Sequence, residues 1–168
     1  MSRFSLTFPL NDIAALAKRY EYASDAKVRS AGRSASERGH YTRAEFLSVC
    51  DWKTSRSRSK VMSNSEEQVI DSTASAFGTQ DERERMDALL QLEGVGVPTA
   101  SALLQFAFPK EYPILDVRAL ESLGERGSSV YSTSYWLEYL TFCRDLAQDA
   151  SVSIRTLDKA LWQHSKER

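Results

Sequence analysis

Apolar side chains recur every three to four positions along most of the chain, and long alternating runs of apolar and polar residues are absent. This spacing places apolar side chains on one face of an α-helix, whereas a strand requires a period of two. The pattern predicts an all-α protein with eight to ten helices, folded as a single compact multi-helix domain over residues 1–168. The clearest helical segments are residues 11–20, 42–52, 65–78, 81–92, 98–108, 117–123, 133–142 and a segment that begins near 153.

Capping residues and polar segments refine this picture. Thr42 followed by Glu45 matches a capping box, in which the two side chains satisfy free amides at a helix start. For the long helix near 133, either Thr133 or Ser134 is the expected cap. Residues 25–39 fit either an exposed helix or a mobile linker, and residues 53–64 fit a loop or a mobile segment.

The composition is that of an ordinary globular protein, with 42% hydrophobic and 27% charged residues. No apolar run approaches the roughly 20 residues that a membrane helix requires, so no membrane association is expected. The N-terminus lacks the continuous apolar core of a signal peptide, which makes the cytoplasm the expected location. Only two cysteines occur, Cys50 and Cys143, so a four-cysteine iron–sulfur cluster is excluded and no metal site is expected.

The charge is distributed unevenly although the net charge is only −1. Residues 1–60 carry a net charge of +6 and residues 61–168 a net charge of −7, which can produce a basic face on a nearly neutral protein. The densest basic stretch holds four cations and no acid, at Lys53, Arg56, Arg58 and Lys60. A solvated loop and a loop that contacts phosphate explain this stretch equally well.

The most informative element is the turn at Gly94-Val95-Gly96, which precedes an apolar helix. Both glycines permit a positive φ and let another molecule approach the backbone closely. With the first helical turn, which includes Thr99, the turn presents free amides to an anion such as a DNA phosphate. An ordinary corner between two helices is the alternative, and the turn itself contains no lysine or arginine.

A second motif follows the turn at a defined distance. Leu92, the glycine turn and Thr99-Ala100 precede the segment Pro113–Arg118, and Asp116 lies 18 residues after position 98. With these two motifs at this separation, residues 92–123 resemble the helix-hairpin-helix (HhH-GPD) superfamily of DNA glycosylases. That superfamily includes endonuclease III-like, adenine-mismatch and alkylbase glycosylases, and the match covers about a fifth of the chain.

The resemblance implies a helix-hairpin-helix core at about residues 81–124, a duplex DNA partner and a role in DNA repair. It implies that Gly94, Val95, Gly96 and Thr99 contact DNA, together with the cations of the basic stretch. No cofactor is expected, although a monovalent cation at the hairpin is compatible with the sequence. Bifunctional members carry a lysine that forms a Schiff base with the sugar, but this chain has Pro98 at that position. The expected activity is therefore monofunctional hydrolysis without a lyase step.

Asp116 is the expected catalytic residue. A carboxylate close to C1′ stabilises the positive charge that develops on the deoxyribose as the base departs, and it can orient or deprotonate a water. An aspartate before Val-Arg-Ala-Leu is also a good N-cap, and one carboxyl group can serve both roles.

Aromatic residues are expected to line a pocket for the displaced base. Trp52, Tyr41, Tyr112 and Trp136 are the aromatic side chains considered for this pocket. Lys53 is a solvated lysine, a phosphate contact, or an aid to chemistry if the chain folds it toward Asp116.

Three functions therefore remain open. The first is a monofunctional DNA glycosylase, and the second is a non-enzymatic helix-hairpin-helix module that binds nucleic acid. The third is a helical scaffold for another protein, in which the glycine turn is only a corner. The fold cannot choose between them, because function resides in the site.

Overall fold

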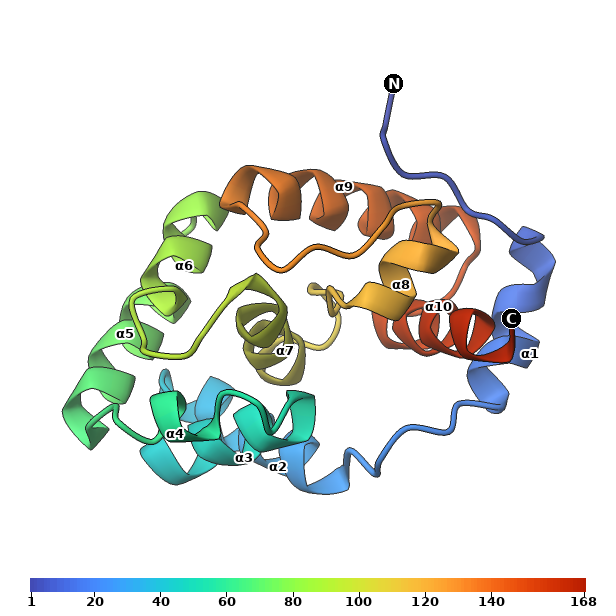
Figure 1. Cartoon of the computed structure of the whole chain (residues 1–168). Helices are drawn as coiled ribbons and strands as arrows, with labels where there is room; N and C mark the ends of the chain where they lie inside the picture. The colour runs from blue at the N-terminus through green and yellow to red at the C-terminus, as the bar shows by residue number, and fades with distance from the viewer.

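Ten α-helices and one short 3₁₀ helix make up the fold, and no strand interrupts them (Figure 1). The computed structural model describes the whole chain, residues 1–168, and confirms the all-α prediction. The elements are η1 (Leu10–Asp12), α1 (Ile13–Lys18), α2 (Ala26–Arg38), α3 (Arg43–Lys53), α4 (Arg58–Val61), α5 (Glu66–Gly78), α6 (Glu82–Leu89), α7 (Val97–Ala107), α8 (Val117–Ser122), α9 (Thr133–Asp149) and α10 (Ile154–Glu167). No helix combines the length and apolar character needed to cross a membrane.

Side-chain caps fix several helix starts where the sequence places them. The predicted capping box of α3 is present, because the Thr42 side chain accepts from the Glu45 amide and the Glu45 carboxylate accepts from the Thr42 amide. The start of α9 differs from the prediction, since Ser132 is its N-cap and Thr133 is already helical. The error is of one residue and reflects three hydroxyl side chains in a row.

Helix α7 lies at the centre of the molecule and every one of its residues except Pro98 is buried (Figure 1). Helices α2, α3 and α6 pack against it. A glycine in α2 permits the closest approach, because a Cβ atom at Gly32 would lie 2.0 Å from the carbonyl oxygen of Phe106. The segment 25–39 therefore forms a helix whose inner face belongs to the core, with Val28, Gly32 and Ala35 buried.

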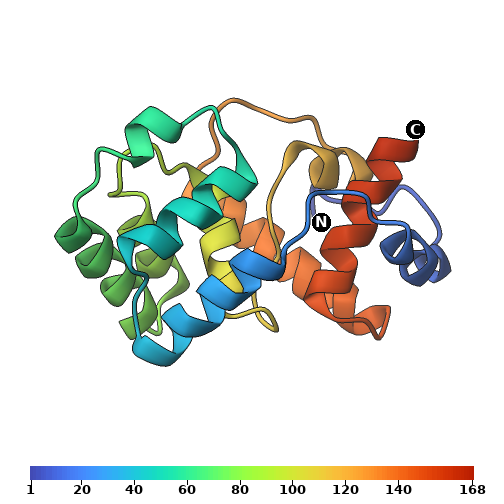
Figure 2. The ribbon, with the colours of Figure 1, turned by 90° about the horizontal axis from the view of Figure 1, so that it is seen from below.

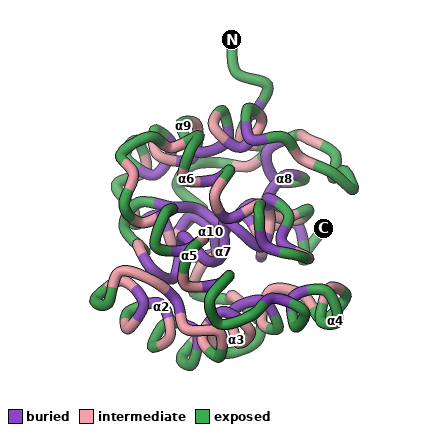
Figure 3. Tube along the Cα trace, turned by 90° about the vertical axis from the view of Figure 1, so that its left-hand side faces the viewer, coloured by how far each residue is buried: buried purple, intermediate pink, exposed green.

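The helices fall into two groups. Helices α2 to α7 form one group, and α1, α8 and α10 form the other, with α1 packed along α10 (Figure 2). Helix α9 contacts both groups, through α6 and α10. The N-terminal segment joins the second group, because the amides of Ser5 and Thr7 donate to the carbonyls of Leu123 and Ser122. Residues 19–25 connect the groups, and a tube coloured by burial shows the buried positions concentrated on the inner faces of both (Figure 3).

Replacing Gly32 by Ala is expected to lower the free energy of unfolding by about 3 kcal/mol, because the new methyl group meets rigid backbone of α7. Urea denaturation followed by circular dichroism measures the change. Gly78→Ala is the matched control, since a Cβ atom there meets nothing within 4 Å at the end of α5. That variant should be neutral or more stable by up to about 1 kcal/mol. Equal effects of the two changes would contradict the assigned α2–α7 contact.

Candidate functional site

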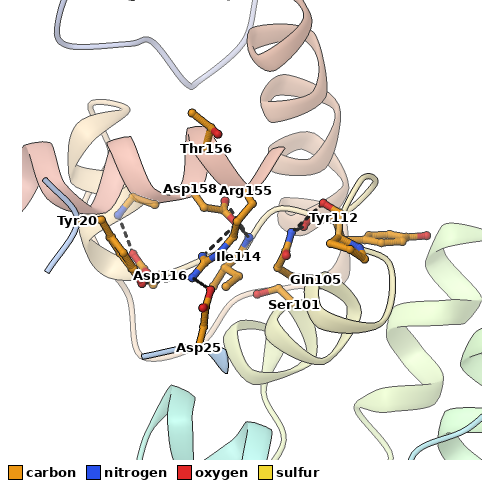
Figure 4. A network of polar contacts seen from close by, with 12 residues as sticks. Tyr20, Asp25, Ser101, Gln105, Tyr112, Ile114, Asp116, Arg155, Thr156 and Asp158 are labelled. Carbon is orange, nitrogen blue, oxygen red and sulfur yellow. Dashed lines mark hydrogen bonds and ion pairs between the residues drawn. The ribbon is translucent and has the colours of Figure 1, made fainter. Parts of the chain in front are cut away.

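The segment that leads to α8 is extended and buried without being part of a sheet. Its backbone groups therefore need side-chain partners. Asp158 of α10 accepts from the Ile114 amide at 3.1 and 3.0 Å, and the Tyr139 hydroxyl of α9 donates to the Ile114 carbonyl at 2.8 Å. The Ser101 hydroxyl of α7 accepts from the Leu115 amide at 2.9 Å. Figure 4 shows Ser101, Ile114 and Asp158 around this segment. Three helices thus fix the position of the next residue, Asp116.

Asp116 is the N-cap of α8. Its Oδ1 accepts from the Ala119 amide at 2.7 Å, and its Oδ2 takes part in no hydrogen bond. The side chain is half-buried and lies at the wall of two adjoining hollows. One carboxylate oxygen is therefore engaged in the cap while the other is free for a ligand.

The first hollow, the aromatic cavity, has a volume of about 200 Å³ and lies between the two groups of helices. Tyr20 and Tyr22 come from the connection between α1 and α2, Trp52 from α3 and Trp162 from α10. The rings meet edge to face, with centroids 4.9 Å apart for Tyr22 and Trp52 and 5.3 Å apart for Tyr20 and Trp162. The Tyr22 hydroxyl also donates to the Trp52 carbonyl at 2.7 Å. These contacts hold the wall in one shape.

The second hollow, the glycine groove, has a volume of about 440 Å³ and is mainly polar. Gly94, Gly96 and Thr99 line one side of it, and Ser128 and Ser129 of the loop before α9 line another. Four residues line both hollows: Lys53, Arg56, Asp116 and Val117. Asp116 is therefore placed where the aromatic cavity and the glycine groove meet.

Only the first glycine of the turn uses a positive φ. Gly94 has a φ of 76°, and a Cβ atom there would lie 2.8 Å from the Cβ of Lys60. Gly96 has a φ of −98°, which any residue can adopt, so the positive φ that this glycine permits is not used. A Cβ atom at Gly96 would meet only Pro98, at 3.7 Å, so this side of the turn is open.

The turn leaves a set of amides without a protein acceptor. The N–H groups of Gly94, Gly96, Val97 and Thr99 take part in no hydrogen bond, and no side chain caps α7. Free amides at a helix N-terminus attract anions, because they carry the positive end of the helix dipole. The groove therefore has the chemistry of an anion site.

A buried amide side chain holds the turn in place. Asn64 donates to the carbonyl of Glu93 and accepts from the amide of Glu93, both at 2.9 Å, and it also donates to the Val61 carbonyl. The pairing fixes the turn to the segment 53–64, which contains the short helix α4. Nothing in the sequence around Asn64 indicates this role, since an asparagine in a polar stretch usually belongs to a surface turn.

The basic stretch folds beside the glycine turn and supplies the cations that the turn lacks. Lys53 and Arg56 line the groove, and the Lys60 side chain lies against Gly94. Arg58 instead forms an ion pair with Asp51 at 3.0 Å, with both side chains exposed. The four cations predicted to act together thus lie in one region, but one of them is already paired.

Lys53 is half-buried rather than fully solvated. It lines both hollows, as Asp116 does, and forms no ion pair or hydrogen bond. Burial lowers the pKa of Lys53 below that of a free lysine, although the charge of Asp116 opposes this shift. The solvated-lysine interpretation is therefore wrong, and this amine belongs to the candidate site.

Three of the four aromatic residues considered for the pocket lie elsewhere. Trp52 lines the aromatic cavity, whereas Tyr41, Tyr112 and Trp136 are fully buried core residues. The Tyr41 hydroxyl donates to the Leu103 carbonyl, and the Tyr112 ring stacks on Trp136. The Tyr112 hydroxyl donates to Glu82, so both tyrosine hydroxyls have protein partners outside the cavity. No group of three His, Cys, Asp or Glu side chains is arranged to hold a metal, and Cys50 and Cys143 are buried free thiols.

Replacing Lys53 by Met is expected to raise the free energy of unfolding at pH 7 by about 1 kcal/mol, because the half-buried charge is removed. Because the pKa of Lys53 is lowered in the folded state, folding of the wild type is destabilised at any pH at which the unfolded lysine is protonated. This destabilisation is therefore present below about pH 10.4. The advantage of the variant should therefore shrink as the pH rises toward that value. Urea denaturation between pH 7 and about 10.5 measures it. Lys27→Met on the exposed face of α2 is the control and should show no advantage. A variant less stable than the wild type at pH 7 would contradict this account.

Comparisons with known proteins leave this site to be interpreted from its own geometry. No model of a protein family, no curated protein and no solved structure matches the chain. The chemistry of the site therefore has to follow from the residues that line the aromatic cavity and the glycine groove.

Proposed function

We propose that the protein is a monofunctional DNA glycosylase of the helix-hairpin-helix type that removes a modified base from duplex DNA. The observation that carries the proposal is the position of Asp116, which lines both the aromatic cavity and the glycine groove and keeps Oδ2 free of hydrogen bonds. A reacting sugar has to touch its base on one side and its phosphates on the other, and the two hollows provide for both.

The glycine turn serves as the phosphate grip in this proposal. Its four unpaired amides are donors for phosphate oxygens, and Gly96 leaves the backbone open to a DNA strand. Lys53, Arg56 and Lys60 add charge that requires no specific base sequence. These three side chains supply the positive charge that the turn itself lacks.

The aromatic cavity serves as the receptor for a base rotated out of the helix. Its volume of about 200 Å³ is below the range of about 300–1,000 Å³ that is usual for drug-sized ligands, and it suits a single planar ring system. Rotating a base out of the stack costs a few kcal/mol, and contacts with aromatic rings offset part of that cost.

Asp116 performs the chemistry at C1′. The bond between C1′ and the base nitrogen breaks, and its electron pair leaves with the base, which takes up a proton. The free Oδ2 stabilises the positive charge on the sugar and accepts a proton from the attacking water, whose oxygen forms the new bond to C1′. Because Oδ1 remains bonded to the Ala119 amide, the carboxylate is fixed during this step.

A non-enzymatic DNA-binding module is the second candidate. The amides of the glycine turn and the cations beside it favour DNA binding whether or not Asp116 acts on a sugar. The two candidates share their DNA contacts and differ only in the fate of the bound base.

Replacing Asp116 by Asn is expected to lower the rate of base release by about 10²–10⁴-fold while leaving the fold and DNA affinity intact. Asparagine keeps the oxygen that caps α8, so stability should change little. Asp81→Asn is the matched control, because Asp81 caps α6 in the same way through the Glu84 amide, outside both hollows. Release of the base from duplexes that each carry one modified base measures the rate.

The product identifies the nucleophile. Attack by water gives an intact strand with an abasic site, and borohydride should trap no adduct. Strand cleavage, or a trapped adduct that Lys53→Met removes, would assign the nucleophile to the Lys53 amine and contradict monofunctional hydrolysis. Full activity of Asp116→Asn would contradict the catalytic role of the carboxylate, and an absence of release from every duplex would favour the non-enzymatic module.

Replacing Arg56 by Ala is expected to weaken binding to unmodified duplex DNA and to reduce the slope of log K against log salt by about 1. Arg58→Ala is the matched control. Arg58 is paired with Asp51, so its removal should weaken DNA binding less than the removal of Arg56. Fluorescence anisotropy between about 50 and 200 mM salt measures both slopes. Binding that does not depend on salt, or that neither change affects, would contradict the proposed contact and favour a protein partner.

A further inference from the structure

Arg155 of α10 forms part of the wall of the aromatic cavity. Its side chain is only 15% exposed, and its guanidinium lies over the rings of Tyr20, Trp52 and Phe106 at 5.3, 5.7 and 5.6 Å from their centroids. Figure 4 shows it directed from α10 toward Asp25 at the start of α2. A long cation therefore reaches the interior of the cavity that we assign to the base.

The hydrogen-bonding capacity of this guanidinium is only partly used. An arginine side chain offers five N–H donors. Nη2 donates to Asp25 at 3.2 Å and to the Tyr20 hydroxyl at 3.4 Å. Nε is buried without a partner, and Nη1 is 3.9 Å from Asp158, beyond hydrogen-bond distance. Unpaired donors at a buried charge are costly, so a ligand with an acceptor atom would be favoured here.

The charge of the wall disfavours a cationic ligand. Four cations line the cavity, Lys53, Arg56, Arg118 and Arg155, against two carboxylates, Asp116 and Asp158. Both oxygens of Asp158 already accept from the Ile114 amide, and burial raises the pKa of this group. The cavity therefore has an excess of positive charge.

The aromatic rings do not compensate for this excess. Ring faces attract cations, but three of the four tyrosine and tryptophan rings of the wall already have a guanidinium over them. Arg155 lies over Tyr20 and Trp52, and Arg118 lies over Trp162 at 5.3 Å. Among the rings that line the cavity, only Tyr22 has no cation over it, so a cationic base would find few free ring faces and no excess of carboxylates.

We infer that the aromatic cavity selects a neutral base with carbonyl oxygens, which accept hydrogen bonds from Arg155, and rejects bases that carry a positive charge. Uracil and 8-oxoguanine represent the accepted class, and 7-methylguanine within DNA represents the rejected class. The inference rests on the proposed function, since it names the substrate class of the same site.

The test compares base release from three duplexes that differ only in one base: uracil, 8-oxoguanine or 7-methylguanine. The wild-type protein should release at least one of the two neutral bases and should leave 7-methylguanine in place. Arg155→Lys keeps the charge but loses the planar set of donors, and it should lower kcat/KM for the neutral base by at least about tenfold. Lys27→Met on the exposed face of α2 is the control and should not change release.

A binding measurement separates recognition from catalysis. Asp116→Asn should bind the duplex with the neutral base more tightly than the duplex with 7-methylguanine, and adding Arg155→Lys should reduce this preference, because the donors for the carbonyl oxygens are lost while the positive charge remains. Circular dichroism and thermal unfolding of each variant establish that it is folded.

The outcomes distinguish the two proposals. Preferred release of 7-methylguanine, or release of a neutral base that Arg155→Lys does not affect, overturns the inference while the glycosylase function stands. An absence of release from every duplex, combined with an Arg155-dependent binding preference, overturns the glycosylase function while the inference stands. If there is no base release and no binding preference, both proposals are overturned.

Discussion

A buried backbone segment without a sheet partner is the constraint on which the rest of this structure depends. Each N–H and C=O group of the chain before α8 has to be satisfied away from water, and side chains of different helices do this. Ser101 accepts a hydrogen bond from the Leu115 amide. Asp158 accepts from the Ile114 amide, and Tyr139 donates to the Ile114 carbonyl. The requirement ties α7, α9 and α10 to one point in space. The next residue is Asp116, whose Oδ2 takes part in no hydrogen bond.

The two hollows share a wall because of the same constraint. Ser101 also donates to the Pro98 carbonyl at 2.7 Å, so a single hydroxyl connects the first turn of α7 to the segment that positions Asp116. The distance between the glycine turn and the carboxylate is therefore set inside the core rather than by a surface loop. Groups that act together on one substrate benefit from such rigid support, because small displacements cost much of their effect.

Periodicity and caps predict this fold well, because both depend on neighbours in sequence. The helical pattern, the capping box of Thr42 and the cap at Asp116 follow from residues within four positions of one another. The cavity wall does not, since Tyr20, Trp162 and Arg155 meet only after α1 packs along α10. An aromatic residue in a helical pattern does not reveal whether its neighbour is a core or a cavity. The sequence alone therefore does not separate Tyr41 and Tyr112, which are core residues, from Trp52, which lines the cavity.

The connection between α1 and α2 joins the two groups of helices and carries two rings of the cavity wall. Whatever fills the cavity touches this connection, α3 and α10 at once, so its binding free energy adds to the association of the two groups. Binding to the folded state alone raises the apparent stability in proportion to the logarithm of ligand concentration. Ligand binding in the cavity and the association of the two groups of helices are therefore linked equilibria. A bound ligand stabilises the arrangement of the helices that form its own site.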